Sequence, residues 1–283
     1  LKFLGRKRLR KISLKFFLKL ITLSIVGFSA LFAQGTAGTS AKFEFRRLID
    51  MPTAGVLERG YTGLSLDVMP YGTVISTIEV GVFDNFSFGI SFGGSNIIGT
   101  GKVEWYDRPG VSARFRLIDE STSTPAVVLG FDSQGKGRYF SNLRRYEIKS
   151  PGFFAAVAKN FDFLGYLSIH GEMNYSLERS DSDKSVDFRF GVEKTIGKKV
   201  SIIAEYDFGW NDNSGKNIGT GRGYLNMGLR WSIVDGFTLG ADLRDLLNNK
   251  KFTTSSADRA IFVEYIKSKL SDDLARKIIG SQE

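Results

Sequence analysis

The sequence of 283 residues contains no cysteine, one histidine and only five prolines. The absence of cysteine excludes disulfide bonds, a lipid-bearing cysteine and thiolate metal sites. Beyond the first 37 residues, no apolar run approaches the roughly 20 residues of a membrane-spanning helix. If this chain enters a membrane, it must therefore do so as a closed sheet, because lipid leaves no other way to pair every backbone group.

The first 37 residues have the layout of a secretory signal peptide. Eight basic residues and no acidic one precede a thirteen-residue apolar run, Leu20–Phe32, which is followed by small residues. We expect cleavage near Ala33 or Ala37; an uncleaved signal anchor is the alternative. Without this segment the formal net charge falls from +9 to about +1, since 31 basic residues face 30 acidic ones. The basic composition is therefore no sign of nucleic-acid binding.

The stretch 164–178, LGYLSIHGEMNYSLE, alternates between apolar and polar residues. One face has Leu167, Ile169, Met173, Tyr175 and Leu177, and the other has Ser168, His170, Glu172, Asn174, Ser176 and Glu178. A period of two predicts a strand. Its length exceeds the usual five or six residues of a soluble strand and matches the roughly 9 to 11 tilted residues that cross a bilayer.

The same alternation recurs along the chain and predicts an all-β, transmembrane, antiparallel up-and-down barrel of about twelve strands. The strands are expected at 64–68, 74–82, 86–92, 111–117, 124–133, 151–161, 167–177, 186–193, 202–210, 225–231, 237–243 and 261–265. Segments 124–133 and 151–161 are poorly phased, because apolar and polar residues do not alternate clearly along them. Long and short connections alternate, except at the short turn 70–72, as expected for extracellular loops and periplasmic turns.

Periodicity alone does not say which face of the sheet meets lipid. The alternative is a secreted soluble β-barrel that binds a small apolar ligand. It would bury the Phe-rich face of each strand and expose the charged face. Strand length, the export signal and aromatic residues near strand ends, such as Tyr61, Trp210 and Trp231, favour the membrane barrel. We therefore expect the apolar face of each strand on the outside of the barrel and the ionisable face on the inside.

The ionisable faces of the strands then line the lumen. Its residues are Glu79, Arg114, Arg116, His170, Glu172, Glu178, Asp187, Arg189, Glu193, Glu205, Asp207, Arg230, Asp242, Arg244 and Glu264. We expect a network of ion pairs that narrows or blocks the pore. Such a lumen is either a path for a polar solute or polymer, or a solvated and self-neutralised interior.

No catalytic site is expected. His170 points inward in the middle of its strand, whereas a barrel esterase would need a nucleophile and a base in hydrogen-bond reach at the rim. We therefore predict a non-enzymatic protein without cofactor or metal. Its expected partners are outer-membrane lipid, the barrel-assembly machinery and a polysaccharide or other polar solute, and not nucleic acid.

Two stretches carry a family resemblance. The segment 48–54, LIDMPTA, and the segment 108–117, RPGVSARFRL, resemble the YjbH-like group of bacterial outer-membrane proteins. The resemblance implies an outer-membrane β-barrel associated with exopolysaccharide production or export, and it transfers no catalytic residue.

Four regions are expected along the chain. They are a signal peptide (1–37), a periplasmic lead-in (38–60), the barrel (61–267) and a polar C-terminal tail (268–283). A plug or edge segment at Lys42–Leu48 stays open as an alternative for part of the lead-in. The tail has Leu270, Leu274 and Ile278 at helical spacing after Ser271, which predicts a short periplasmic helix.

Overall fold

A computed structural model describes residues 37–40, 42–213, 218–251 and 257–267. Most of the expected signal peptide and the expected helix of the tail lie outside the described residues. Within the described part, no helix is both long and apolar enough to cross a membrane.

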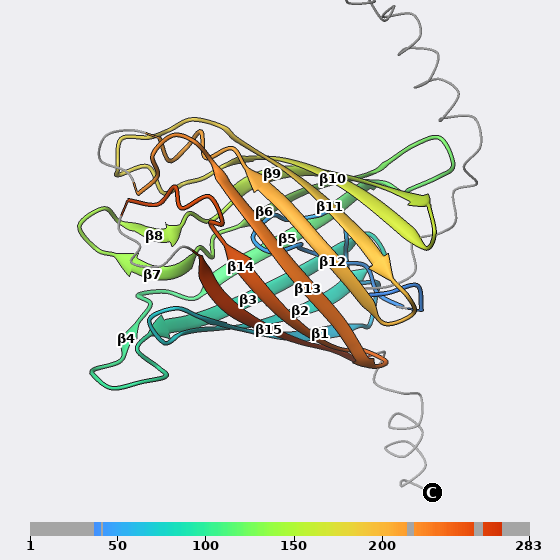
Figure 1. Ribbon diagram of the computed structural model, residues 1–283, viewed down its shortest axis with the longest axis horizontal. Helices are drawn as coiled ribbons and strands as arrows, with labels where there is room; N and C mark the ends of the chain where they lie inside the picture. The colour runs from blue at the N-terminus through green and yellow to red at the C-terminus, as the bar shows by residue number, and fades with distance from the viewer. Residues whose placement is uncertain (1–36, 41, 214–217, 252–256, 268–283) are drawn as a thin grey trace, which may run out of the picture.

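Twelve strands close into one antiparallel barrel (Figure 1). They are β1 (Thr62–Met69), β2 (Thr73–Phe83), β3 (Phe86–Ser95), β5 (Gly110–Ile118), β6 (Ala126–Asp132), β9 (Gly152–Asp162), β10 (Tyr166–Tyr175), β11 (Asp187–Ile196), β12 (Val200–Asp207), β13 (Tyr224–Val234), β14 (Phe237–Arg244) and β15 (Asp258–Lys267). Each pairs with its neighbours in chain order, and β1 pairs with β15 from Thr62↔Lys267 to Val68↔Ile261. The predicted fold class, an antiparallel barrel of about twelve strands, is confirmed.

The connections differ at the two ends of the barrel. The end with connections 84–85, 163–165, 197–199 and 235–236 is called the turn end, and the opposite end, with connections such as 96–109 and 208–223, the loop end. Three short strands that the sequence did not predict lie in the loops: β4 (Glu104–Trp105), β7 (Lys136–Phe140) and β8 (Arg145–Ile148). The β7–β8 hairpin and the chain on either side of it, residues 133–151, are called the loop cover (Figure 1).

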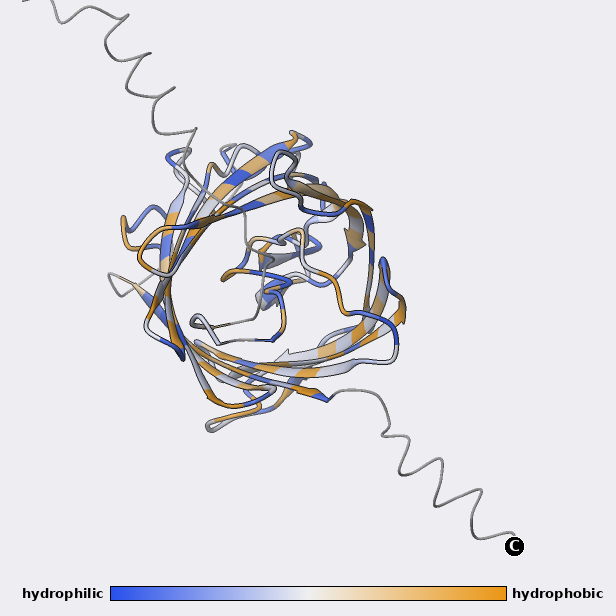
Figure 2. Cartoon of the chain, turned by 90° about the vertical axis from the view of Figure 1, so that its right-hand side faces the viewer, coloured by the Kyte–Doolittle hydropathy of each residue, from blue (hydrophilic) through white to orange (hydrophobic). Residues whose placement is uncertain are grey.

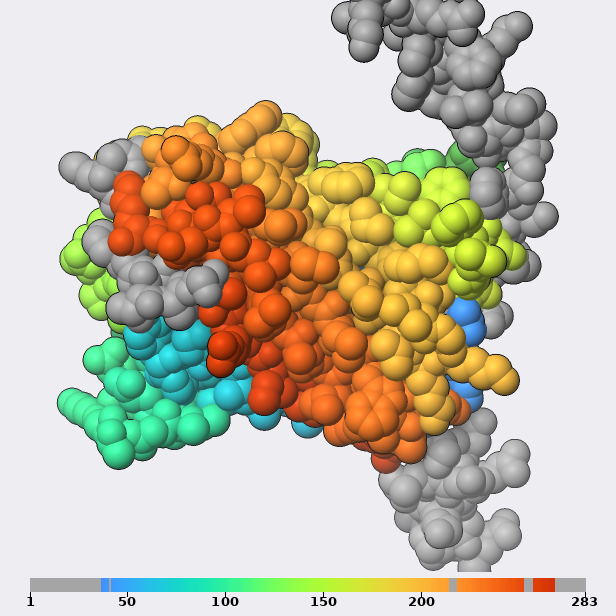
Figure 3. Space-filling model, viewed as in Figure 1, coloured from blue at the N-terminus to red at the C-terminus, as the bar shows by residue number. Residues whose placement is uncertain are grey.

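The outside of the barrel is apolar and the inside is polar. Phe88, Phe115 and Phe190 are 40%, 44% and 47% exposed, whereas the inward Glu172 is 4% exposed. Apolar and polar residues alternate along the strands in the view down the barrel (Figure 2). On the face that the space-filling view shows, side chains fill the space between neighbouring strands (Figure 3). The alternative of a soluble barrel with an apolar interior is therefore wrong.

The chain also runs inside the ring of strands (Figure 2). Residues 45–57, called the plug, turn back at Leu48–Met51, where the Leu48 N–H donates to the Met51 carbonyl at 3.0 Å. Leu48, Ile49 and Met51 are 0% exposed. The expected periplasmic lead-in 38–60 thus differs from the structure over residues 45–57. These residues lie in the lumen, where their apolar side chains pack against the wall.

Two apolar clusters fix the plug against the wall. Near its tip, the side chains of the plug pack with Ile203 of β12. Farther along, Ala54 and Val56 pack with inward residues of β6 and β9, among them Val128 and Phe154. Each cluster is buried on one side by the plug and on the other by the wall, so the plug and the barrel share one core.

Candidate functional site: the plugged lumen

The carboxylate of Glu205 holds the tip of the plug. It accepts the backbone N–H of Ile49 at 2.9 Å, of Asp50 at 3.0 Å and of Met51 at 3.2 Å. Asn226 donates to the same carboxylate at 2.8 Å. Three adjacent N–H groups on one buried carboxylate form an anion-binding turn, with the anion supplied by the barrel wall.

Asp50 is the charged side chain at the tip. Arg244 of β14 donates through Nε to both of its oxygens, at 3.1 and 2.9 Å, and Lys136 of the loop cover donates to Oδ1 at 2.8 Å. Burial alone would raise the pKa of Asp50, but the charges of Arg244 and Lys136 outweigh it and hold the pKa below its ordinary value. Asp50 is therefore ionised in the plugged state.

Arginines of the wall bind the backbone carbonyls of the plug. Arg230 donates to the carbonyl of Leu48 at 2.7 Å, and Arg189 to that of Asp50 at 3.3 Å. Nearer the turn end, Arg116 donates to the carbonyl of Ala54 at 2.8 Å, and Arg114 to that of Arg46. The plug is thus held through its main chain as well as its side chains.

The base of the plug contributes two arginines of its own. Arg46 pairs with Glu79 at 2.7 Å and also with Glu264. Arg47 pairs with Asp67 of β1 at 2.5 Å. Burial opposes the charged form of both, but these carboxylates outweigh it and raise the pKa of Arg46 and of Arg47.

Inward glycines leave the room that the plug occupies. A Cβ on Gly191 of β11 would lie 2.2 Å from Cδ1 of Leu48, and one on Gly228 of β13 would lie 3.3 Å from Cδ1 of Ile49. A larger residue at position 191 would collide with the plug. The wall is therefore shaped to the tip.

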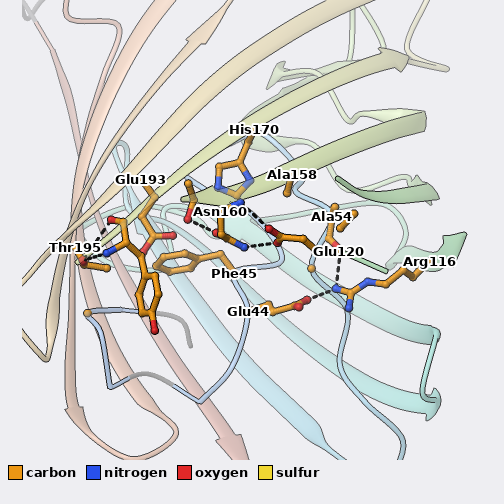
Figure 4. Close-up of a pocket in the computed structure, with 15 residues that line it drawn as sticks. Glu44, Phe45, Ala54, Arg116, Glu120, Ala158, Asn160, His170, Glu193 and Thr195 are labelled. Carbon is orange, nitrogen blue, oxygen red and sulfur yellow. Dashed lines mark hydrogen bonds and ion pairs between the residues drawn. The ribbon is translucent and has the colours of Figure 1, made fainter. Parts of the chain in front are cut away.

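The cavities around the plug are small. One of about 50 Å³ lies between the plug and the β9–β11 wall, with Phe45, His170 and Glu193 around it (Figure 4). Another, of about 80 Å³, lies against β1, β2, β3 and β5. At about 10–15 Å³ for each water-sized probe, these spaces hold a few waters each. In this state the plug narrows the lumen.

The loop cover lies over the tip at the loop end. Arg145 is 1% exposed and pairs with Asp181 at 3.0 Å and with Asp212 at 2.5 Å. Lys250 pairs with Glu147 at 3.2 Å. These ion pairs join four long loops, so cross-linked loops, and not the plug alone, narrow the mouth of the barrel at this end.

The residues predicted to line the lumen lie as follows. Twelve are buried, and Glu79, Arg116 and Glu178 are partly exposed. Those that contact the plug through a hydrogen bond or ion pair are Glu79, Arg114, Arg116, Arg189, Glu205, Arg230, Arg244 and Glu264. Glu178 lies in a loop and accepts the N–H of Tyr146 and of Ser150.

The remaining predicted residues, apart from His170, bond to residues outside the plug. Glu172 accepts a hydrogen bond from Asn174, Asp187 from the N–H of Trp210 and Glu193 from the hydroxyl of Ser201. Asp207 and Asp242 pair with Arg189 and Arg230. His170 is 5% exposed, and among the described residues neither of its ring nitrogens has a hydrogen-bond partner. Within the described ranges, no group of three or more His, Cys, Asp or Glu residues could hold a metal ion. That the protein is not an enzyme stays a prediction.

Sequence reasoning missed the charged partners that are not on the twelve strands. Asp50 and Lys136 are the main ones, and Arg145 joins the loops. Asp50 stands between Ile49 and Met51, and an isolated acid among apolar residues is a signal that it is buried with a cation. Lys136 and Arg145 carry no comparable signal, because loop charges are normally solvated.

A closed hydrogen-bonded wall, an apolar exterior and a polar lumen together define a transmembrane β-barrel, which places the protein in the bacterial outer membrane. No family model and no curated protein matches the chain, so the YjbH-like resemblance stays a prediction.

Similar solved structures include the KdgM porin, at 11% identity and a TM-score of 0.46 over 72% of this chain and 98% of that one. The NanC porin is similar at 9% identity and a TM-score of 0.38, over 74% and 100% of the two chains. No conclusion about solutes follows from similarities of this size.

Proposed function

We propose that this protein is an outer-membrane channel that is closed at rest by its plug and passes a polar solute when the plug leaves the lumen. The supporting observation is that, besides the two apolar clusters, polar side chains of the wall hold the plug by hydrogen bonds and ion pairs. Water can replace each of these polar contacts when the plug moves, so displacement leaves a pore lined by solvated polar side chains. Passage of a polysaccharide, implied by the YjbH-like resemblance, is one case of this proposal.

A reversible disulfide between the plug and the wall tests the proposal. Leu48 and Gly191 are chosen for the cysteine pair because they are in direct contact between plug and wall: a Cβ at position 191 would lie 2.2 Å from Leu48 Cδ1. The chain has no other cysteine. We expect Leu48→Cys/Gly191→Cys to show no channel openings in a planar bilayer when oxidised, and openings when reduced.

The two single-cysteine variants are the controls and should not respond to reductant. Equal conductance of the oxidised and reduced double variant would show that passage does not require plug movement. If the reduced protein shows no openings, even with Glu205 replaced by Ala to loosen the tip, the barrel is a sealed scaffold of the envelope and the proposal fails.

A further inference from the structure

Arg244 has hydrogen-bond donors that nothing described in the structure uses. Its side chain is 1% exposed and bonds Asp50 through Nε alone. Among the described residues, Nη1 and Nη2 have no hydrogen-bond partner, and Nη2 comes no closer than 3.8 Å to Asp242 Oδ2. A guanidinium stays charged, and buried donors without a partner cost free energy, so in native proteins they normally face water or a ligand.

Arg244 lines a cavity under the loop cover. The cavity has a volume of about 30 Å³ and also borders Asp50 at the plug tip. This is room for about two water-sized probes, at about 10–15 Å³ each. Two oxygen atoms opposite Nη1 and Nη2 are the arrangement in which a carboxylate binds an arginine fork.

The other cations of this cavity already have partners. Lys149 donates to the Asn211 carbonyl at 2.7 Å and pairs with Asp181 at 2.7 Å, and Arg189 pairs with Asp207 at 2.9 Å. Five cationic and five acidic side chains line the cavity, so its charges balance and do not repel an anion. The unused donors therefore single out Arg244.

We propose that Nη1 and Nη2 of Arg244 bind the carboxylate group of an anionic solute that enters from the loop end. This inference rests on the proposed channel function and names the class of its solute. The bound carboxylate competes with Asp50 for the charge of the same guanidinium. Solute binding therefore weakens the contact between the plug tip and the wall, and the two equilibria are coupled.

Acetate is the probe for this site. The full chain in detergent micelles is titrated with sodium acetate against sodium chloride at constant ionic strength, by calorimetry. We expect saturable binding to the native chain and at least tenfold weaker binding to Arg244→Lys, which keeps the charge and loses the fork. An arginine fork also binds phosphate, but inorganic phosphate is larger than acetate and fits a cavity of about 30 Å³ less well, so it should bind at least tenfold more weakly.

Lys149→Gln is the matched control, because it removes one positive charge from the same cavity and no unused donor. Its acetate affinity should stay within twofold of the native value. Equal loss in Lys149→Gln and Arg244→Lys, or phosphate binding as tight as acetate binding, would mean general attraction of anions and overturn the proposal. The absence of saturable acetate binding to the native chain would overturn it too.

A second measurement keeps Arg244 intact. Ala54 of the plug is 1% exposed, and the chain has no cysteine, so Ala54→Cys introduces a single buried thiol. Saturating acetate should speed its reaction with a maleimide at least threefold, and an unchanged rate would contradict the coupling. A chain that binds acetate but never conducts refutes only the channel, and one that conducts without binding acetate refutes only the carboxylate site.

Discussion

Replacing Glu205 with Ala should release the tip of the plug. The carboxylate of Glu205 accepts the N–H groups of Ile49, Asp50 and Met51 at 2.9 to 3.2 Å. No other described acceptor is bonded to these three donors, so the substitution leaves them unpaired inside the lumen until water enters. The plugged state therefore loses stability relative to the displaced state.

The size of this loss can be worked out from the contacts. A hydrogen bond to a charged group contributes about 1.5–3 kcal/mol, so three of them set an upper range of roughly 5–9 kcal/mol. Water entering the space left by the side chain returns part of this, and the repulsion between Glu205 and Asp50 disappears as well. We expect a net loss of about 3 kcal/mol, which is about a hundredfold in the open population.

The rate of maleimide reaction at Ala54→Cys measures that population, because a buried thiol reacts only when the plug opens. Glu205→Ala in this background should react about a hundredfold faster than Ala54→Cys alone. Glu172→Ala is the matched control, since Glu172 is a buried inward carboxylate whose partners are Asn174 and Arg189 and not the plug. A Glu205→Ala rate within threefold of the parent rate, or an equal rise in Glu172→Ala, would refute the reasoning.

Acidity, the inward glycines and the lipid face give three more expected outcomes. Burial alone would raise the pKa of Asp50, but its cationic partners outweigh burial and hold the pKa below its ordinary value of about 4. The charge of Asp50 therefore stabilises the plugged state at neutral pH. This stabilisation is lost as the pH falls through the lowered pKa. Asp50→Asn should therefore conduct more than the native chain at pH 7 and lack this part of the acid response below about pH 4. Gly191→Leu should collide with Leu48 and speed thiol reaction at Ala54→Cys at least tenfold, whereas Gly171→Leu, on the lipid side, should not. Phe190→Arg should lower the free energy of unfolding in vesicles by about 2–4 kcal/mol relative to Phe190→Leu, measured with urea; equal stabilities would mean that Phe190 does not face lipid.

The barrel could be predicted because its strands obey one simple rule. Along β10, Ile169 and Met173 face outward while His170, Glu172 and Asn174 face inward, as the alternation indicated. The alternation depends only on the contrast between lipid and water, which every strand shares. The number of strands and the order of long and short connections could therefore be predicted from the same alternation.

The plug could not be located in the same way. A plug or edge segment at Lys42–Leu48 was one alternative, and it overlaps the plug only at residues 45–48. The two poorly phased segments explain why. Val128 of β6 and Phe154 of β9 are inward and apolar because they pack against Ala54 and Val56 of the plug. Both faces of these strands are therefore apolar, one toward lipid and one toward the plug. The loss of alternation in these two strands indicates an apolar partner inside the barrel. Periodicity does not say which segment of the chain that partner is.

The plug contacts divide into two kinds that do different work. Leu48, Ile49 and Met51 are fully buried, and each such side chain contributes about 1.5–3 kcal/mol when it leaves water. The ion pairs of Arg46 and Asp50 add less than their number suggests, because losing water offsets much of their attraction. Apolar packing thus supplies much of the free energy that holds the plug, and the polar contacts add to it and fix the position of the tip. A solute at Arg244 acts on the charged contacts. It therefore shifts the equilibrium toward the displaced plug only by the difference between its affinities for the displaced and the plugged state.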